Sequence, residues 1–550
     1  MAAAKAIVGT KSFVSLKRRS RETMPRMTNV NLFRDRPVAV IGAGVMGIGI
    51  VQVALLAGHP VHLFDVREGA AAAAAEQLMA TLDKLADKGR LTPETVTAAR
   101  ARLHVAGALA QLRDAALVIE AIVEDLAVKQ ALLRDLEAIV LPDCVLASNT
   151  SSLSITAVAR GLQAPGRVVG MHFFNPVPLM RLVEVVSGLA TEAAVADAIH
   201  MLAQDWGKTA VHAKSTPGFI VNRIARPFYA ETLALLQERA ATPAVLDACV
   251  RGAGFRMGPC ELMDLIGHDT NLAVTQSVYE ANFFDKRYQP SLVQREMVDG
   301  GLLGRKSGRG FYRYPEGGAK VGDDVVETTP LPAVPLVLRG NGAFADLLAT
   351  RLAGSGLGFA REAGADDAEV GLQIGDGLLL LTDGRCAGER AVACGIADLA
   401  LFDWPAGSAA AGSTTPVAAL AWSIAAQASA EFAAQAQAVL RALGWQPQRV
   451  ADVPGLVVAR TIAMLVNEAS DAVEQGVCDE AGADVAMTLG VSYPAGPFAW
   501  LASFGADPVV RLLDALDAFY RGERYRVSPR LRRAAWASTE SRARDSAMAR

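Results

Sequence analysis

The segment VAVIGAGVMGIGI, residues 38–50, constrains the fold of this 550-residue chain more than any other segment. Residues 38–41 predict a buried strand, and Gly42, Gly44 and Gly47 follow it with the spacing G-x-G-x-x-G. A helix over about residues 45–57 and a second strand over 61–65 come next. The first glycine permits a tight turn, the second lets the backbone approach a pyrophosphate, and the third lets helix and strand pack closely. The segment therefore predicts a dinucleotide-binding unit.

Asp65 lies at the end of the second predicted strand. A carboxylate at this position accepts hydrogen bonds from a ribose diol and repels a 2′-phosphate, which favours NAD over NADP. Arg67, two residues later, weakens this preference because a guanidinium attracts phosphate. We predict NAD as the cofactor.

Strand and helix patterns alternate from the glycine turn to RVVGMHFF, and they predict a Rossmann-type α/β domain with a parallel sheet over residues 35–216. From about Pro217 the strand patterns cease, and helical periodicity predicts an all-α domain over residues 217–318. The proline-rich run TTPLPAVP ends a linker over 319–335.

Residues 336–450 begin with LVLRGNGAFADLLATRLAGSGL, which predicts a strand, a glycine turn and a helix of a reduced Rossmann-like domain. Its later strands are expected in DGLLLLTDG and LALFDWP. Ala345 occupies the third glycine position, and no acidic residue ends a convincing second strand. We therefore do not expect this domain to bind a nucleotide.

An internal repeat relates two helical segments of the chain. TPGFIVNRIARPFYAE (216–231) recurs as VPGLVVARTIAMLVNE (453–468), and residues 252–269 recur as 490–507, at an offset of 237 to 238 residues. A second, degenerate copy of the helical domain is therefore predicted over 451–533. Ala459 stands where the first copy has Asn222, so we expect the second copy to retain packing without catalysis.

The two ends differ from the rest of the chain. Residues 1–27 carry seven basic residues and one acidic residue, Glu22. We interpret segment 1–34 as an unstructured extension, or a spurious one translated from an upstream start, with a transit peptide as the alternative. Residues 534–550 are expected to form a disordered tail.

Composition narrows the classes of function. A net charge of -3 argues against a nucleic-acid partner, and no apolar run approaches the ~18 residues of a membrane helix. Six cysteines are scattered without a CxxC pair or a histidine cluster, which favours a reducing, cytoplasmic location and predicts no metal site.

His172, in VVGMHFF, is predicted to lie on a strand whose carboxyl end faces the ligand side of the sheet. Glu184, in LVEVV, is a carboxylate among apolar neighbours, and such groups are normally paired. An imidazole backed by a carboxylate is suited to removing a proton from an alcohol. A core histidine with a satisfied ring is the alternative, and the context favours catalysis.

Ser151 and Ser152 follow a predicted strand in SNTSSL. Serine is a favoured N-cap, so one of them is expected to cap the next helix while the other contacts substrate. Asn222 carries an amide that can donate to a carbonyl or hydroxyl oxygen, with polar pairing in the core as its structural alternative.

These motifs together resemble the L-3-hydroxyacyl-CoA dehydrogenase family over about residues 36–318. The resemblance implies NAD-dependent oxidation of an (S)-3-hydroxyacyl-CoA to the 3-oxoacyl-CoA, and a helical domain like that of 6-phosphogluconate dehydrogenase. It implies that His172 is the base, that Glu184 orients it, that Ser151 bonds the substrate oxygen, and that Asn222 positions the reacting groups.

Further contacts follow from the same resemblance. Glu124, Lys129, Asn175 and Lys306 are implied to contact NAD, although Lys129 and Lys306 taken alone are typical solvated surface charges. TLDKLADKGRLT resembles the family's CoA-contacting helical arm, with Thr81 and Lys88 at matching positions; here threonine replaces the usual serine.

The plan of the whole chain resembles long bacterial members of the family that act on 3-hydroxyadipyl-CoA in phenylacetate breakdown. General 3-hydroxybutyryl-CoA metabolism is the first alternative. A dehydrogenase of free hydroxy acids and a non-catalytic NAD- or CoA-binding scaffold are the others. The helical domain mediates dimerisation in shorter members, so we expect either a homodimer or a monomer in which the duplicated copy imitates that dimer.

Overall fold

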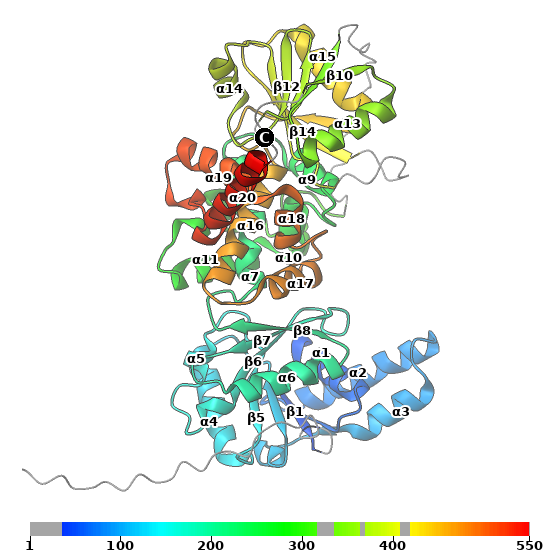
Figure 1. The fold of residues 1–550 in the computed structure, drawn as a ribbon. Coiled ribbons are helices and arrows are strands. Elements are labelled where there is room, and N and C mark those ends of the chain that lie inside the picture. The colour runs from blue at the N-terminus through cyan, green and yellow to red at the C-terminus, as the bar shows by residue number, and fades with distance from the viewer. Residues whose placement is uncertain (1–32, 34–35, 316–334, 363–368, 408–417, 549–550) are drawn as a thin grey trace, which may run out of the picture.

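The computed structural model describes residues 33, 36–315, 335–362, 369–407 and 418–548, with side chains up to residue 539. The predicted extension 1–34, apart from Phe33, and the predicted linker 319–335, apart from Pro335, lie outside the described residues. Phe33 belongs to the first domain, because it is buried in its core and its carbonyl oxygen lies 3.1 Å from His59 Nδ1. Figure 1 shows a sheet domain at each end of the molecule and a block of helices between them.

The first domain contains an eight-stranded sheet in the order β3-β2-β1-β4-β5-β6-β7-β8. Its strands are β1 (Val38–Ile41), β2 (Val61–Phe64), β3 (Leu103–Val105), β4 (Leu117–Glu120), β5 (Val145–Ser148), β6 (Val168–Phe173), β7 (Leu182–Ser187) and β8 (Thr209–Lys214). Its helices are α1 (Val45–Leu56), α2 (Ala70–Asp87), α3 (Pro93–Arg102), α4 (Leu126–Ile139), α5 (Ile155–Val158) and α6 (Ala193–Asp205).

The sheet is parallel, as predicted, except at one pair of strands. β6 and β7 are antiparallel and place His172 opposite Glu184, whereas the other pairs are parallel. The connection between these two strands, residues 174–181, is shorter than the dozen or more residues that a parallel crossover needs. Helices α2 and α3 form an arm that extends away from the sheet (Figure 1).

The first helical unit comprises α7 (Val221–Ile224), α8 (Arg226–Gln237), α9 (Pro243–Gly252), α10 (Pro259–Ile266), α11 (His268–Ala281) and α12 (Leu292–Asp299). The second comprises α16 (Val458–Glu474), α17 (Glu480–Gly490), α18 (Pro497–Phe504), α19 (Ala506–Tyr520) and α20 (Pro529–Met548). Short 3₁₀ turns are η2 (Leu109–Leu112), η3 (Pro165–Arg167), η4 (Lys286–Tyr288), η5 (Arg305–Ser307) and η6 (Glu523–Tyr525).

The prediction of a disordered tail over 534–550 is wrong for most of its length, because α20 runs through it to Met548. Arginine, alanine and glutamate in this segment are strong helix formers. Leu531 and Ala535 are buried, and the helix packs against α16 and α19, so its first turns are fixed by the core.

The two helical units pack against each other through reciprocal buried ion pairs. Glu468 of the second unit binds Arg223 (2.6 Å) and Arg287 (3.1 Å) of the first. Glu231 of the first unit binds Arg460 and Arg524 of the second, both at 2.9 Å. The members of each set are related by the repeat offset of 237 residues. Such reciprocity is the signature of a two-fold interface, and here it lies within one chain.

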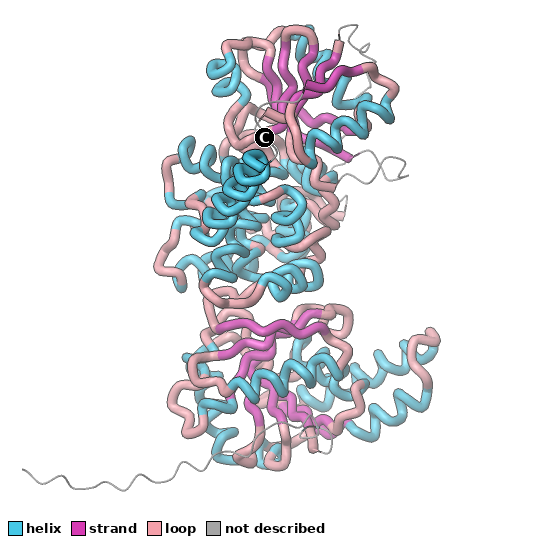
Figure 2. The backbone as a smooth tube through the Cα atoms, viewed as in Figure 1, coloured by secondary structure: helices cyan, strands magenta, loops and turns pink. Residues whose placement is uncertain are grey.

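The reduced domain has a seven-stranded mixed sheet in the order β10-β9-β11-β12-β13-β14-β15. Its strands are β9 (Leu336–Arg339), β10 (Phe359–Glu362), β11 (Gly371–Ile374), β12 (Gly377–Leu381), β13 (Leu399–Phe402), β14 (Ala418–Ile424) and β15 (Trp445–Arg449). Its helices are α13 (Ala343–Ser355), α14 (Ala387–Cys394) and α15 (Ala430–Ala442). Figure 2 shows the strands gathered in two separate sheets with helices between them.

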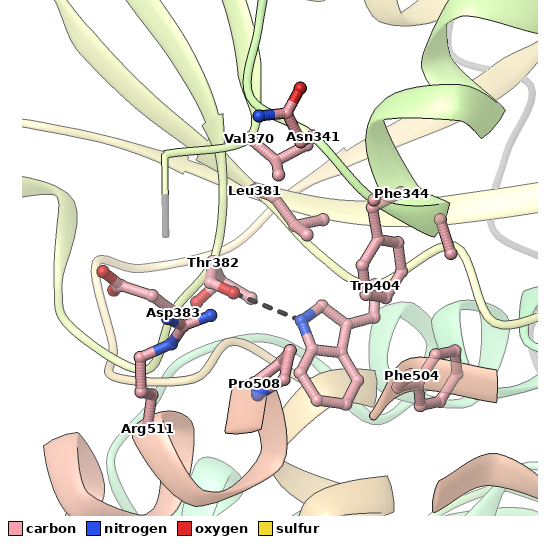
Figure 3. A pocket seen from close by; sticks show the side chains of 12 residues that line it. Asn341, Phe344, Val370, Leu381, Thr382, Asp383, Trp404, Phe504, Pro508 and Arg511 are labelled. Carbon is pink, nitrogen blue, oxygen red and sulfur yellow. Dashed lines mark hydrogen bonds between the residues drawn. The ribbon is translucent and has the colours of Figure 1, made fainter. Parts of the chain in front are cut away.

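One sequence expectation for the reduced domain is wrong: an acidic residue, Glu362, does end the second strand, β10. A small cavity of about 90 Å³ lies where this domain meets the second helical unit (Figure 3). Phe344, Trp404 and Phe504 form its aromatic wall, and the Trp404 indole donates to the carbonyl of Thr382 at 3.2 Å.

Candidate active site

The glycine turn between β1 and α1 has the geometry that a dinucleotide needs. A Cβ on Gly42, whose φ is +104°, would lie 2.5 Å from the carbonyl oxygen of Ala121, and one on Gly47 would lie 1.8 Å from the carbonyl oxygen of Gly42. Gly44 has nothing within 4 Å of its Cβ position. The first and third glycines are therefore required by packing, while the second leaves open space at the N-terminus of α1. No acidic residue occupies the first turn of this helix, so the turn fits a pyrophosphate.

Asp65 lies directly after β2 and is held in place beside the glycine turn. It accepts hydrogen bonds from the backbone N–H of Ala43 (2.8 Å) and from the Arg67 side chain (3.0 Å). The Arg67 guanidinium, followed by the backbone donors, lowers the pKa of Asp65 to about 2. The carboxylate is therefore an ionised acceptor where the sequence predicts the adenosine ribose.

Lys129 is buried and not a solvated surface charge, contrary to what its sequence context alone indicates. Its Nζ lies 2.8 Å from Glu120 and 3.3 Å from Glu124. Glu120, at the end of β4, also accepts the hydroxyl of Ser148. Burial raises the pKa of Glu120 despite its contact with Lys129. This cluster fixes the end of β4 next to the glycine turn.

Glu124 organises the loop that carries the two predicted serines. Its Oε1 accepts the Thr150 hydroxyl (2.6 Å), the Ser151 N–H (2.9 Å) and the Ser152 hydroxyl (3.0 Å). Burial acts to raise the pKa of Glu124, but the Thr150 hydroxyl and Lys129 more than offset it and lower the pKa. The carboxylate thus remains ionised and holds the loop.

The expectation that Ser151 or Ser152 caps a helix is wrong. The N-cap of α5 is Ser154, whose hydroxyl accepts the Ala157 N–H. Because Glu124 and Thr150 hold residues 150–153 in a loop, the helix begins after Ser151 and Ser152, at Ile155.

His172 and Glu184 are paired across β6 and β7, with His172 Nδ1 2.5 Å from Glu184 Oε2. Glu184 is fully buried, and its other oxygen accepts the N–H groups of Ile220 (3.0 Å) and Val221 (2.9 Å) at the start of α7. His172 Nε2 donates to no described residue and is not among the fully buried atoms. One carboxylate therefore orients the histidine and joins the first domain to the first helical unit.

A cleft of about 440 Å³ separates the first domain from the first helical unit. Glu124, Ser151 and Ser152 line one side, and Asn222 with residues of α11 lines the other. The Asn222 amide donates to the backbone carbonyl of Ser151 at 3.4 Å. The structure thus brings Ser151 and Asn222 together on the wall of this cleft, with one residue from each domain.

The remaining predicted positions lie outside this cluster. Lys306 lies on η5 and pairs with Asp269 of α11 at 2.5 Å, close to the cleft wall. Asn175 is exposed after β6. Thr81 and Lys88 are exposed on the arm, where the Thr81 hydroxyl donates to the Gln77 carbonyl.

The structure adds residues that sequence reasoning did not single out. Glu120 and Ser148 complete the Lys129 cluster, and Asn149 accepts the Phe173 N–H at 2.9 Å next to the catalytic histidine candidate. The available signal was the position of each directly at or after a strand's carboxyl end, where ligands of doubly wound folds bind.

Within the described part of the chain, no helix combines the length and apolar composition needed to cross a bilayer. Among the same residues, no group of three or more His, Cys, Asp and Glu side chains is arranged to hold a metal ion.

Comparisons with known proteins agree with this architecture. Residues 37–216 match the NAD-binding domain of 3-hydroxyacyl-CoA dehydrogenase. Residues 218–314 and 455–548 both match the C-terminal domain of that family, and residues 379–454 match a 3-hydroxybutyryl-CoA dehydrogenase reduced Rossmann-fold domain. The two matches to one C-terminal domain agree with the internal repeat.

Two relatives illustrate the range of lengths. The 3-hydroxyadipyl-CoA dehydrogenase of Escherichia coli K12 is 42% identical over 90% of this chain and 97% of its own length. A probable 3-hydroxybutyryl-CoA dehydrogenase of Bacillus subtilis is 42% identical over 51% of this chain and 98% of its own length.

A solved structure extends the likeness to three dimensions. The crystal structure of 3-hydroxybutyryl-CoA dehydrogenase from Escherichia coli K12 is 39% identical, with a TM-score of 0.81 over 92% of this chain and 99% of that one. The glycine turn, the duplicated helical unit and these full-length likenesses lead to one conclusion. The chain belongs to the 3-hydroxyacyl-CoA dehydrogenase family, NAD-binding oxidoreductases.

Proposed function

We propose that this chain oxidises an (S)-3-hydroxyacyl-CoA to the 3-oxoacyl-CoA, with His172 as the general base. The observation that carries the proposal is the 2.5 Å contact between His172 Nδ1 and Glu184, which leaves Nε2 as the nitrogen available to a substrate. NAD, when bound, accepts the hydride that leaves C3 of the substrate. The protein supplies the base, its orientation and the polar groups around the reacting oxygen.

The proton step uses groups already in place. His172 Nε2 removes the hydroxyl proton while Glu184 holds the ring by Nδ1 and stabilises the imidazolium that forms. The Glu184 side chain is fixed in orientation, because the N–H groups of Ile220 and Val221 donate to its other oxygen. Ser151 and Asn222, which lie together on the cleft, hold the substrate oxygen.

The cofactor side of the site follows from the same assignment. Gly42, Gly44 and Gly47 accommodate the pyrophosphate, and Asp65 accepts the ribose hydroxyls. Further NAD contacts are assigned to Glu124, Lys129, Asn175 and Lys306. Lys129 acts through Glu120 and Glu124, because it is buried between them.

The acyl chain proposed is 3-hydroxyadipyl, because the relative that spans 90% of this chain carries that name. 3-Hydroxybutyryl-CoA is the second candidate, since the solved structure of matching length is named for it. Thr81 and Lys88 on the arm are proposed CoA contacts, where a cation suits the nucleotide phosphates. We place the reaction in the cytoplasm, in keeping with six free cysteines.

The test is NADH formation by purified protein with 3-hydroxyadipyl-CoA and with 3-hydroxybutyryl-CoA. A higher kcat/KM for the first supports the proposed acyl chain, and a higher value for the second selects the alternative. Absence of turnover with both, while NAD still binds by calorimetry, would contradict the catalytic proposal and favour a scaffold.

A further inference from the structure

A pocket of about 270 Å³ lies between the two helical units, and Thr275 of α11 lines it, whereas Ser277 and Val278 of the same helix line the cleft next to Ser151. Its walls include the rings of Tyr229, Tyr288 and Tyr525. The hydroxyls of Tyr288 and Tyr525 are bound by Glu468 and Glu231. The pocket therefore offers an apolar body with polar groups at a few points, which is typical of a small-molecule site.

Arg226 lines this pocket and is 94% buried, since its relative exposure is 6%. Its Nε donates to the Asn222 carbonyl at 2.8 Å, and its Nη1 donates to the Thr275 hydroxyl at 3.1 Å. Its Nη2 donates to no described residue and keeps some exposure to solvent. Burial lowers the pKa of Arg226, as expected for a guanidinium in which no carboxylate offsets the loss of water.

No carboxylate among the described residues pairs with Arg226, and this sets it apart from the other buried arginines nearby. Arg524 and Arg460 both pair with Glu231. Glu238, the one acidic residue on the described pocket wall, is engaged by the Tyr520 hydroxyl at 2.9 Å and by Arg460 at 3.7 Å. The Arg226 guanidinium lies over the Tyr229 ring, with Cζ 4.9 Å from the ring centroid, but it has no anionic partner among the described residues. A buried cation without an anion is costly, so Arg226 is the group that an incoming anion would pair with.

The internal repeat shows that the fold does not require this cation. The repeat offset places Ala463 where the first unit has Arg226, and Leu513 where it has Thr275. Both replacements are fully buried in the second unit. By contrast, the interface arginines are kept in both units, as Arg223 and Arg460. Arg226 and Asn222 of the first helical unit are thus both replaced by alanine, Ala463 and Ala459, in the second unit.

We propose that this pocket binds a carboxylate, recognised by Arg226. A guanidinium with a free nitrogen matches a carboxylate in charge and in planar geometry, and the tyrosine rings accommodate a short carbon chain beside it. Two sources supply this chemistry. One is the distal carboxylate of a dicarboxylic acyl chain, three carbons beyond the hydroxyl-bearing carbon in 3-hydroxyadipyl-CoA. The other is a free small dicarboxylate.

The first source rests on the proposed function and the second does not. Asn222 connects the pocket to the cleft, because its amide faces Ser151 while its carbonyl accepts Arg226. A ligand on Arg226 is therefore one helical turn from the group that positions the reacting oxygen.

The experiment compares the full chain with Arg226→Gln, Arg226→Lys and the control Arg295→Gln, an exposed arginine paired with Asp299 on α12. The first arm measures kcat/KM for 3-hydroxyadipyl-CoA and 3-hydroxybutyryl-CoA. If the acyl chain supplies the carboxylate, Arg226→Gln lowers the ratio of the two values about 10- to 100-fold, with part restored by Arg226→Lys. The control leaves the ratio unchanged.

The second arm measures adipate binding by calorimetry in the absence of CoA. Binding by the unaltered protein that Arg226→Gln abolishes identifies a free dicarboxylate as the ligand. The proposal is overturned if Arg226→Gln has the same substrate ratio as the unaltered protein and, in addition, adipate binds both proteins equally or binds neither. NAD binding and the thermal unfolding midpoint establish whether each variant is folded. If Arg226→Gln is misfolded, the comparison of Arg226→Lys with Arg295→Gln decides. Equal substrate ratios and equal adipate binding in these two variants then overturn the proposal. If no protein turns over either CoA ester, the proposed function fails while the adipate arm still tests the pocket.

Discussion

Glu184 and Asp403 perform the same structural task in the two halves of the chain. Glu184 accepts the N–H groups of Ile220 and Val221 at the start of α7, and Asp403 accepts those of Val457 and Val458 at the start of α16. The donor positions on the two helices are 237 residues apart, which is the repeat offset. Each carboxylate thus fastens a sheet to the helical unit that follows it.

The two carboxylates differ in what their second oxygen binds. In Glu184 it binds His172, whereas in Asp403 it accepts the N–H groups of Trp404 and Ala459. The second half therefore retains the connection between sheet and helix without a histidine on the carboxylate. This comparison separates the architectural role of Glu184 from its proposed catalytic one.

Replacement of His172 by glutamine is expected to lower kcat by about 10²- to 10⁴-fold, because a positioned general base contributes that much. NAD affinity should stay the same, since the glycine turn is unaffected. Steady-state NADH formation and NAD calorimetry measure the two quantities. His104→Gln, an exposed histidine on β3, is the control and should behave as the unaltered protein. Equal kcat values for His172→Gln and the control would rule out His172 as the base.

KM for NAD is expected not to follow a titration of Asp65 between about pH 5 and pH 9. The pKa of Asp65 is lowered to about 2, below its ordinary 3.8, so its ionised form persists in this range and is lost only as pH falls through 2. Asp65→Ser should shift the ratio of kcat/KM for NAD and NADP toward NADP by about 10- to 100-fold, through loss of a charged hydrogen bond and of repulsion. A ratio that Asp65→Ser leaves unchanged at a fixed pH would contradict this assignment.

Lys129→Met is expected to destabilise the NAD-binding domain by about 3–5 kcal/mol, because it leaves Glu120 buried without its cation. The double replacement Lys129→Met with Glu120→Leu should recover most of this loss, since no buried charge remains. Denaturant unfolding followed by tryptophan fluorescence measures both. A double variant as unstable as the single one would show that the ion pair is not the source of the effect.

A chain shortened to residues 1–318 is expected to self-associate. Removal of the second helical unit takes away Glu468, the partner of Arg223 and Arg287, and Glu231 of another copy offers the equivalent carboxylate. The Bacillus subtilis relative matches 51% of this chain over 98% of its own length, so a protein of about this shortened length occurs in the family. Gel filtration with light scattering checks the state, and Glu231→Ala in the shortened chain should give a monomer. A monomeric shortened chain would count against the imitation of a dimer.

The first domain was predictable because its signals are local in the sequence. The G-x-G-x-x-G turn, Asp65 and the apolar strand before them lie within thirty residues, and the structure places them as expected. The second helical unit was predictable because two of its segments repeat the sequence pattern of the first unit. His172 and Glu184 were also found, because a carboxylate among apolar residues signals a partner.

Other features depend on contacts that no local pattern contains. Burial of Lys129 follows from the meeting of α4 with the end of β4, and the sequence around it is that of an ordinary exposed helix. The reciprocal ion pairs join residues more than 180 positions apart. In the reduced domain the signal was present: the two-residue turn Gly375-Asp376 connects β11 to β12 as a hairpin, and this antiparallel pair interrupts the expected Rossmann pattern.

Covalent duplication of the helical unit changes how its interface responds to dilution. Two separate chains held by the same ion pairs would come apart once their concentration fell below the dissociation constant. Within one polypeptide the encounter is unimolecular, and the tether sets an effective concentration that does not depend on protein abundance. The first helical unit, which carries Asn222, therefore keeps its packing partner even when only a few molecules are present.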